Sequence, residues 1–210
     1  MASLILSSTL DEASINLARA LVESSDWQNV ENFDHGRVRR HSERPVTILE
    51  IDELHIHADE IDMVHMDETG DSIDEVLVLS RHVSSTNTPA ITLHAIGLPG
   101  ITPTGEKGVA GGVNGHVVPP SPRFSSLYRK MLEVARKNGL EGDFDLTMET
   151  THHGPRLETP SLYIEIGSTE AEWNRKDAAM VWSTVICDVL GLNGAEPQGE
   201  WAGSGSVMVG

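Results

Sequence analysis

The chain has 210 residues, enough for one folded domain with a sizeable core, and apolar residues make up 39% of it. Its single cysteine, Cys187, excludes an internal disulfide and favours a reducing compartment, so we expect a cytoplasmic protein. The formal net charge of −17 argues, taken as a whole, against a nucleic-acid binder, and no apolar run is long enough for a membrane span.

The first third of the chain predicts a strand, a helix and a second strand. Residues 3–7 and 46–51 are apolar and favour strands. Between them, Thr9 and Glu12 form a capping-box pattern at the start of an apolar helical repeat, whose members are Leu10, Ala13, Leu17 and Leu21. Residues 26–45 are polar and predict an irregular surface excursion, and the acidic residues 52–75 predict strand remnants and an exposed loop. We interpret 26–74 as an acidic insertion.

The rest of the chain alternates strands and helices. Strands are expected at residues 75–80, 90–96, 144–153 and 161–167, a long Gly-rich loop at 100–122, and helices at 124–138 and after a second capping box at Thr169 and Glu172. Apolar residues on both faces of several strands indicate a sheet that is covered on both sides. The sequence therefore predicts an α/β fold in which a single domain over 1–210 holds a mixed sheet between helix layers.

Charge is distributed unevenly along the chain. Residues 105–139 hold six basic and two acidic residues, while the remainder carries a net charge of −21. Such asymmetry can direct an anionic ligand to one place, but from charge alone a solvated helix face on an acidic protein is the favoured interpretation. Arg129 and Lys130 lie on this basic segment.

Four of the ten histidines follow or end predicted strands, where α/β proteins build their sites: His82, His94, His152 and His153. His94 could instead be a histidine of the hydrophobic core. His82 could simply mark the exposed end of a strand. Adjacent side chains of an extended chain alternate, so we expect at most one of His152 and His153 to face a given pocket. The following Gly154-Pro155 predicts a rigid turn, which suits a general base or a metal ligand.

Glu149 and Glu165 are candidate catalytic carboxylates because both interrupt otherwise apolar strands, where an unpaired charge is costly. Each carboxylate therefore needs a partner, which can be a histidine, a metal ion, or a hydroxyl or amide group that forms a structural hydrogen bond with it. The sequence lacks a His-Glu-x-x-His zinc motif, a P-loop, a G-x-G-x-x-G fingerprint and a G-x-S-x-G nucleophile elbow. Cys187 lies in an apolar helix and is expected in the core.

Two strings resemble a known family, the archaeal and plant type of D-aminoacyl-tRNA deacylase. They are Glu149-Thr150-Thr151-His152-His153-Gly154-Pro155 and the run from Pro160 to Glu170 with Trp173. Ser80-Arg81-His82 and Leu93-His94, followed by a Gly loop, are similar to earlier motifs of that family. The resemblance runs from about Glu75 to Leu192.

The resemblance implies a peptidyl-tRNA-hydrolase-like or phosphorylase-like fold and hydrolysis of the ester between a D-amino acid and the tRNA 3′ end. On this hypothesis His152, His153, Glu149 and Glu165 are catalytic, with the carboxylates orienting the histidines. Zinc is the implied cofactor, with His94, His152 and His153 as its ligands. Substrate binding is assigned to these residues: His82, Lys107, Gly111, Gly112, Arg129 and Lys130.

Two other functions stay open at this point. A zinc-dependent hydrolase of a small molecule suits the acidic charge better, and a catalytically silent tRNA-binding relative is the third hypothesis. Family members continue past a strand such as Val207 to Val209 into a glycine-rich segment with a further histidine and an aromatic residue. We therefore expect weak or no activity from the 210-residue form.

Overall fold

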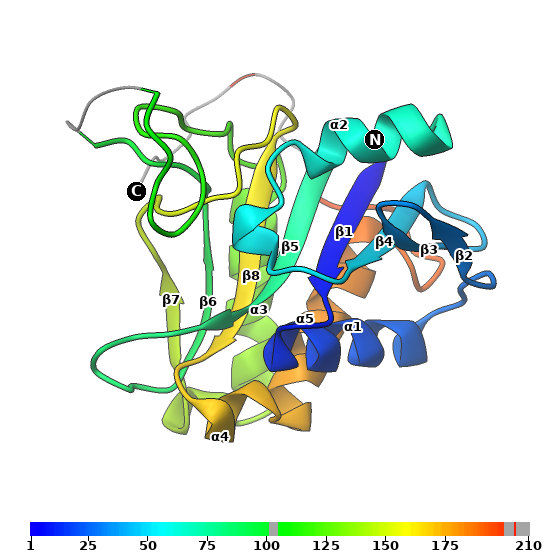
Figure 1. Ribbon diagram of the computed structural model, residues 1–210. Coiled ribbons are helices and arrows are strands. Elements are labelled where there is room, and N and C mark those ends of the chain that lie inside the picture. Colours follow the sequence, from blue (N-terminus) through cyan, green and yellow to red (C-terminus); the bar gives the residue numbers. More distant parts are fainter. Residues whose placement is uncertain (101–104, 200–203, 205–210) are drawn as a thin grey trace.

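The computed structural model describes residues 1–100, 105–199 and 204, and it is built on one eight-stranded mixed sheet (Figure 1). The strand order is β2-β3-β4-β1-β5-β8-β6-β7. The strands are β1 (Ser3–Ser8), β2 (Glu31–Phe33), β3 (Gly36–Arg40), β4 (Val46–Ile51), β5 (Glu75–His82), β6 (Ala90–His94), β7 (Asp145–Met148) and β8 (Ser161–Gly167). Strands β4, β1, β5 and β8 run parallel, whereas β6 is antiparallel to β8. The predicted mixed α/β sheet is confirmed.

Helices cover the two faces of the sheet unequally. Helices α1 (Glu12–Ser24), α3 (Phe124–Lys137) and α5 (Lys176–Leu190) pack on one face. The other face is covered by η1 (His55–His57), α2 (Ile61–Thr69) and loop segments that bring in Val118 and Leu157. Two short helices, η2 (Leu140–Gly142) and α4 (Glu170–Trp173), lie beside β7 and β8. Loops therefore border much of the second face.

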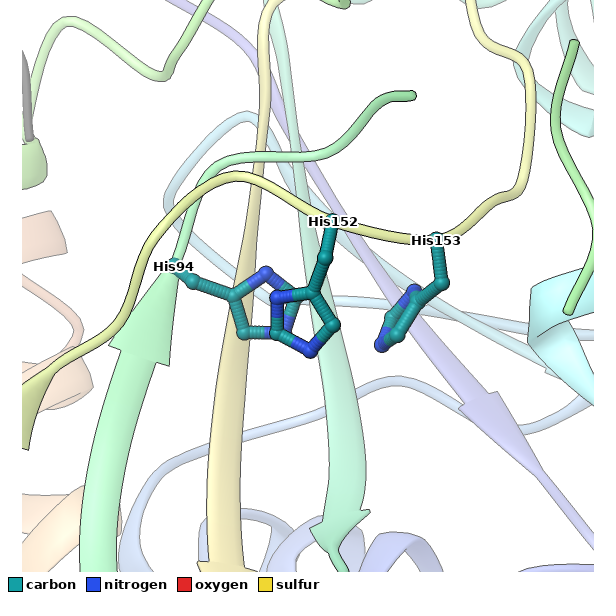
Figure 2. A group of neighbouring side chains, drawn as sticks. All are labelled: His94, His152 and His153. Atoms are coloured by element: carbon teal, nitrogen blue, oxygen red, sulfur yellow. The ribbon is translucent and has the colours of Figure 1, made fainter. Parts of the chain in front are cut away.

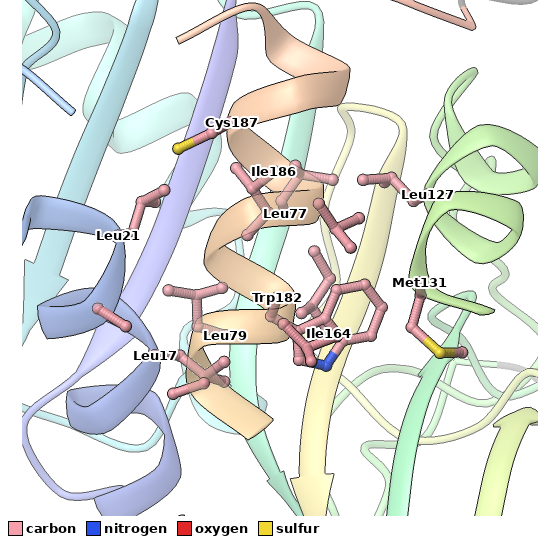
Figure 3. Close-up of a cluster of buried hydrophobic side chains, with 14 of the residues drawn as sticks. Leu17, Leu21, Leu77, Leu79, Leu127, Met131, Ile164, Trp182, Ile186 and Cys187 are labelled. Carbon is pink, nitrogen blue, oxygen red and sulfur yellow. The ribbon is translucent and has the colours of Figure 1, made fainter. Parts of the chain in front are cut away.

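The larger hydrophobic core lies between the sheet and the helices α1, α3 and α5 (Figure 3). Leu77 of β5 and Ile164 of β8 are fully buried in it. The indole of Trp182 on α5 lies among them and donates its Nε1–H to the carbonyl of Glu165 over 3.1 Å, so its polar atom is satisfied. Cys187 belongs to this core, as the sequence predicted.

Residues 26–45 contain the β2–β3 hairpin, so the prediction of an irregular excursion was wrong. The hairpin extends the sheet beyond β4, and Val38 is the one residue of β2 and β3 that is fully buried. Charged side chains pair across the strands, as when Arg37 Nε donates to Glu50 Oε1 over 2.7 Å. An edge strand that is stabilised by charges lacks the apolar run by which strands are recognised in sequence.

Residues 52–75 were predicted as strand remnants and an exposed loop, and this too was wrong, because η1 and α2 occupy the segment. The inward face of α2 carries Asp62 and His65, which are both fully buried. Asp62 Oδ2 accepts hydrogen bonds from the backbone N–H groups of Glu158 and Thr159. Because polar side chains hold this helix in place, its sequence shows little apolar periodicity.

The start of α1 lies two residues later than the capping-box pattern indicated. Asp11, not Thr9, is the N-cap, and its Oδ1 accepts a hydrogen bond from the Ser14 N–H over 2.9 Å. Leu10 therefore lies outside the helix and is 58% exposed. The prediction that Leu10 belongs to the apolar face of this helix was wrong, whereas Leu17 is buried as expected.

Several other boundaries also differ from expectation. The capping box at Thr169 and Glu172 is present, but it caps the four-residue α4, and α5 begins separately. The strand expected over 144–153 is shorter, and the candidate strand at 207–209 lies outside the described residues. Within the described ranges, no helix has both the length and the apolar character needed to cross a bilayer.

We predict that Leu17→Ala lowers the free energy of unfolding by about 2–5 kcal/mol, because it leaves a cavity in the core. Leu10→Ala is the matched control and should change it by less than about 0.5 kcal/mol, since Leu10 is exposed. Urea denaturation of the two variants checks this. Equal destabilisation by both substitutions would show that Leu10 is part of the core.

Candidate active site

A cleft of about 290 Å³ opens near the carboxyl ends of the parallel strands β1, β4, β5 and β8. Its lining includes Asp11, His55, Arg81, His82, His152, His153 and Glu165. Asp11 and His55 follow β1 and β4 along the chain, and Arg81 and His82 end β5. Open α/β sheets bind their ligands at this edge, so the cleft is the candidate active site.

Glu165 lies between two histidines that come from neighbouring strands. Its side chain is only 3% exposed; Oε2 lies 3.5 Å from His82 Nδ1 and Oε1 lies 3.8 Å from His94 Nε2. Strand β8 runs between β5 and β6 in the sheet, which brings both imidazoles within reach of one carboxylate. Glu149, just after β7, joins the group with Oε1 3.1 Å from His82 Nδ1.

These contacts determine the charges of the group. Burial alone lowers the pKa of His82, but hydrogen bonds with Glu149 and Glu165 outweigh it and raise that pKa to about 9. Burial alone raises the pKa of Glu165, but His82 and His94 hold it well below its ordinary value. The pKa of Glu149 is also lowered, because His82 outweighs burial and the repulsion from Glu165. At neutral pH both carboxylates are therefore ionised and His82 is cationic.

Three further imidazoles form a second group beside the first: His94 at the end of β6, and His152 and His153 from the loop after β7 (Figure 2). The ring centroids of His94 and His152 are 4.0 Å apart, and those of His152 and His153 are 4.5 Å apart. Glu165 connects the two groups through His94, and Glu149 Oε2 lies 3.9 Å from His152 Nε2. The structure thus brings all four predicted catalytic residues together, while their roles stay predictions.

His152 and His153 both belong to this group, although we expected them to face opposite sides. The expectation assumed an extended backbone. The backbone of His153 instead has φ 42°, in the left-handed region, and this bend directs both rings toward His94.

Each of the three imidazoles has its Nδ1 beside a backbone carbonyl. His94 Nδ1 lies 2.9 Å from the Ala95 oxygen, and His152 and His153 Nδ1 each lie 2.7 Å from their carbonyls, those of Thr150 and Gly154. A carbonyl oxygen can only accept, so Nδ1 carries the proton in each ring. The lone pair of each neutral ring is therefore on Nε2.

The surroundings of His153 favour the neutral form of its ring. Burial lowers its pKa to about 4, and the nearby positive charge of His94 acts in the same direction. At neutral pH the Nε2 atom of His153 therefore has a lone pair available in the cleft.

Two sets of residues are close enough to hold a metal ion. One ligand atom from each of His94, His152 and His153 lies within 4.8 Å of the others, and the same holds for His82, Glu149 and Glu165. The buried Nε2 of His94 has no hydrogen-bond partner among the described residues. Three Nε2 atoms whose opposite nitrogens are held by carbonyls suit zinc, so the predicted set His94, His152 and His153 fits that metal.

The predicted task of the two carboxylates needs correction. We expected Glu149 and Glu165 to orient His152 and His153, but their closest histidine contacts are with His82. Backbone carbonyls orient the paired histidines instead. The carboxylates hold His82 and His94, which come from the strands on either side of β8.

The glycine loop packs against the turn that carries the histidines. The Gly154 N–H donates to the Ala110 carbonyl over 3.0 Å, and Gly111 and Gly112 have φ of 72° and 70°. A Cβ atom on Gly154 would lie 2.2 Å from Gly112 N, so the close approach requires glycine. Lys107 forms an ion pair with Asp59 at 3.1 Å. Binding of substrate by Lys107, Gly111 and Gly112 stays a prediction.

The basic helix α3 does not line the cleft. It packs on the opposite face of the sheet, and Lys130 Nζ lies 3.0 Å from Asp188 Oδ2. Arg123, from the same basic segment, is buried in an ion pair with Glu75. Arg129 and Lys130 therefore lie on a surface away from the histidines. Their contact with a substrate stays a prediction.

Sequence reasoning missed four residues of this region: Asp11, His55, Arg81 and Tyr163. Asp11 Oδ2 lies 3.3 Å from His55 Nε2, and His55 Nδ1 lies 3.2 Å from the Tyr163 hydroxyl. The hydroxyl donates to the Gly154 carbonyl over 3.1 Å, so this chain of contacts ends at the histidine turn. Asp11 and His55 both follow the carboxyl end of a predicted strand, which was the signal available in the sequence.

The family model described as D-aminoacyl-tRNA deacylase matches residues 69–206. The chain belongs to the D-aminoacyl-tRNA deacylase family. A D-aminoacyl-tRNA deacylase of Arabidopsis thaliana is 36% identical over 220 residues, covering 100% of this chain and 67% of the relative. That of Archaeoglobus fulgidus is 32% identical over 190 residues, covering 89% of this chain and 64% of the relative.

Solved structures agree with this fold. A crystal structure of a conserved protein of unknown function matches with a TM-score of 0.78 and 29% identity, over 95% of this chain and 65% of that one. A mutant of futalosine hydrolase from Helicobacter pylori matches with a TM-score of 0.51 at 8% identity, covering 89% of this chain and 97% of that one. The latter likeness concerns the fold alone and agrees with the phosphorylase-like expectation. The chain spans 56% of the length of the Methanosarcina acetivorans deacylase and 38% of that of the Methanococcoides burtonii deacylase.

We predict that stability falls as pH rises through about 9, because His82 then loses the proton that its carboxylate partners hold. The folded-state pKa of His82 is raised, so its contribution is complete below the ordinary histidine pKa of about 6.5 and is lost above the raised value. Glu149→Gln should move this loss to lower pH. Urea unfolding at several pH values measures it, with Glu106→Gln, an exposed carboxylate, as control. Identical pH profiles for Glu149→Gln and wild type would contradict the assignment.

Proposed function

We propose that the protein hydrolyses the ester between a D-amino acid and the 3′ end of tRNA, releasing the free amino acid and tRNA. The observation that carries this proposal is a cationic His82 and a neutral His153 on one cleft in a member of the deacylase family. Ester hydrolysis needs a group that takes a proton from water and a group that gives one to the leaving oxygen.

His153 is the proposed proton acceptor. Its Nδ1–H donates to the Gly154 carbonyl, so its Nε2 lone pair can take a proton from water as the water oxygen attacks the ester carbonyl. The carbonyl π electrons move onto the oxygen and form a tetrahedral oxyanion. The low pKa of His153, about 4, keeps the ring in the neutral form that this step requires.

His82 is the proposed proton donor. Its Nδ1 faces the Glu149 and Glu165 carboxylates, which leaves Nε2–H for the substrate. As the carbon–oxygen bond to the ribose breaks, His82 gives this proton to the leaving oxygen. Before that, the positive charge of His82 favours the oxyanion.

Zinc is the proposed cofactor, held by Nε2 of His94, His152 and His153. When bound, a zinc ion lowers the pKa of a coordinated water and polarises a carbonyl. In the metal-free protein Glu165 raises the pKa of His94 against the effect of burial, so zinc binding has to displace a proton there. The Nε2 lone pair of His153 can either bind the zinc ion or accept a proton from water. Removal of the metal distinguishes these two roles.

We predict that the protein deacylates D-aminoacyl-tRNA in preference to the L form, and that His153→Asn lowers kcat by about 10²–10⁴-fold. Release of labelled amino acid from D- and L-tyrosyl-tRNA measures both effects. His57→Asn is the matched control, because His57 is exposed and lies outside the cleft lining. Equal rates on both chiral forms, or full activity of His153→Asn, would contradict the proposed function.

If zinc takes the Nε2 lone pair of His153, a chelator abolishes hydrolysis and added zinc restores it. His94→Asn should bind less zinc than wild type when both are dialysed against the same zinc buffer, because it removes one of three ligands. Mass spectrometry of the bound metal gives this readout without an activity assay, and His57→Asn again serves as control. Full activity of demonstrably metal-free protein would refute the zinc proposal and leave His153 as the direct base.

A further inference from the structure

We propose that Arg81 binds the phosphodiester that precedes the terminal adenosine of tRNA. This inference rests on the proposed function, because that function supplies the substrate. Arg81 lies at the end of β5, next to His82, and is one of the residues that line the cleft. It is the only arginine or lysine of the described residues among the cleft lining.

The structure holds the Arg81 side chain in place before any ligand arrives. Its guanidinium lies over the Trp173 ring, 5.2 Å from the centroid, and the Trp173 indole N–H donates to the His82 carbonyl over 3.1 Å. On the backbone side, the Arg81 N–H donates to Asp11 Oδ2 over 3.1 Å. A guanidinium that is stacked and anchored in this way loses little freedom when it binds an anion.

The hydrogen-bond donors of Arg81 are largely uncommitted. Its ion-pair contact within the described chain is Nε to Asp11 Oδ2 at 3.9 Å, which is longer than a hydrogen bond. Arg37, Arg40 and Arg175, by contrast, each donate to two carboxylates. The side chain of Arg81 is also 33% exposed, so its terminal amino groups are accessible to a ligand.

The chemistry of the substrate indicates which anion this is. The carboxyl group of the amino acid is esterified and carries no charge, so the charged group nearest to the scissile ester on the tRNA side is the phosphodiester of the terminal nucleotide. A guanidinium binds two phosphate oxygens through two parallel N–H groups. Arg81 belongs to the same cleft lining as His82, His152 and His153, whereas Arg129 and Lys130 lie on α3, which is not in that lining.

Binding of two small probes tests this without any hydrolysis. Adenosine and adenosine 5′-methyl phosphate, a phosphodiester mimic, are titrated into wild type, Arg81→Gln and Arg19→Gln at low ionic strength. Wild type should bind the phosphodiester at least about tenfold more tightly than adenosine, the size of one charge-assisted contact. Arg81→Gln should remove this preference. Arg19→Gln should keep it, since Arg19 is exposed on α1.

Equal binding of the two probes by wild type, or no measurable binding of the phosphodiester at millimolar concentration, would overturn the inference. A preference that survives in Arg81→Gln would also overturn it. If Arg81→Gln does not fold, Arg81→Lys replaces it in the experiment. Lysine keeps the positive charge but cannot donate two parallel N–H groups to the phosphate, so the preference for the phosphodiester should fall severalfold. An unchanged preference in that variant counts against the inference. If the proposed function is wrong but the Arg81 inference is right, the protein binds the phosphodiester as predicted and does not hydrolyse D-aminoacyl-tRNA.

Discussion

The buried carboxylate of Glu165 is the constraint on which the rest of the site depends. A charge that is 3% exposed is unfavourable in a protein interior unless positive groups surround it. Glu165 meets this requirement through His82 and His94, which come from the strands on either side of β8. The antiparallel placement of β6 beside β8 brings His94 to the carboxylate, so the mixed topology of the sheet and the electrostatics of the site are connected.

The histidines of the cleft differ in the surroundings that set their protonation states. Glu149 and Glu165 hold His82 cationic, while desolvation and the neighbouring His94 lower the pKa of His153 and hold that half-buried ring neutral against the opposing effect of Glu165. Pairs of titratable groups whose environments move their pKa values apart are typical of acid–base catalysis. Backbone carbonyls accept hydrogen bonds from Nδ1 of His152 and His153, which leaves the Nε2 lone pairs of the neutral rings for chemistry or for a metal.

The sequence predicted the parts of the structure that follow from apolar patterns. The strands β1, β4, β5, β6 and β8 and the helices α3 and α5 were expected from their apolar residues, and Glu149 and Glu165 from their charge within strands. Elements held by polar contacts were missed, as with α2 and its buried Asp62 and His65. The partners of the carboxylates were also misassigned, because they depend on strand order and on the backbone bend at His153, and neither is visible in a single sequence.

The carboxylates of Glu149 and Glu165 hold His82 cationic, while burial and His94 hold His153 neutral in the same cleft. Nitrogen NMR of the histidine side chains in the metal-free protein at pH 7 tests this central claim directly, with residues assigned by single His→Asn variants. The account predicts two protonated nitrogens on His82, and on His153 one protonated Nδ1 with an unprotonated Nε2. A neutral His82 or a doubly protonated His153 at this pH would contradict it.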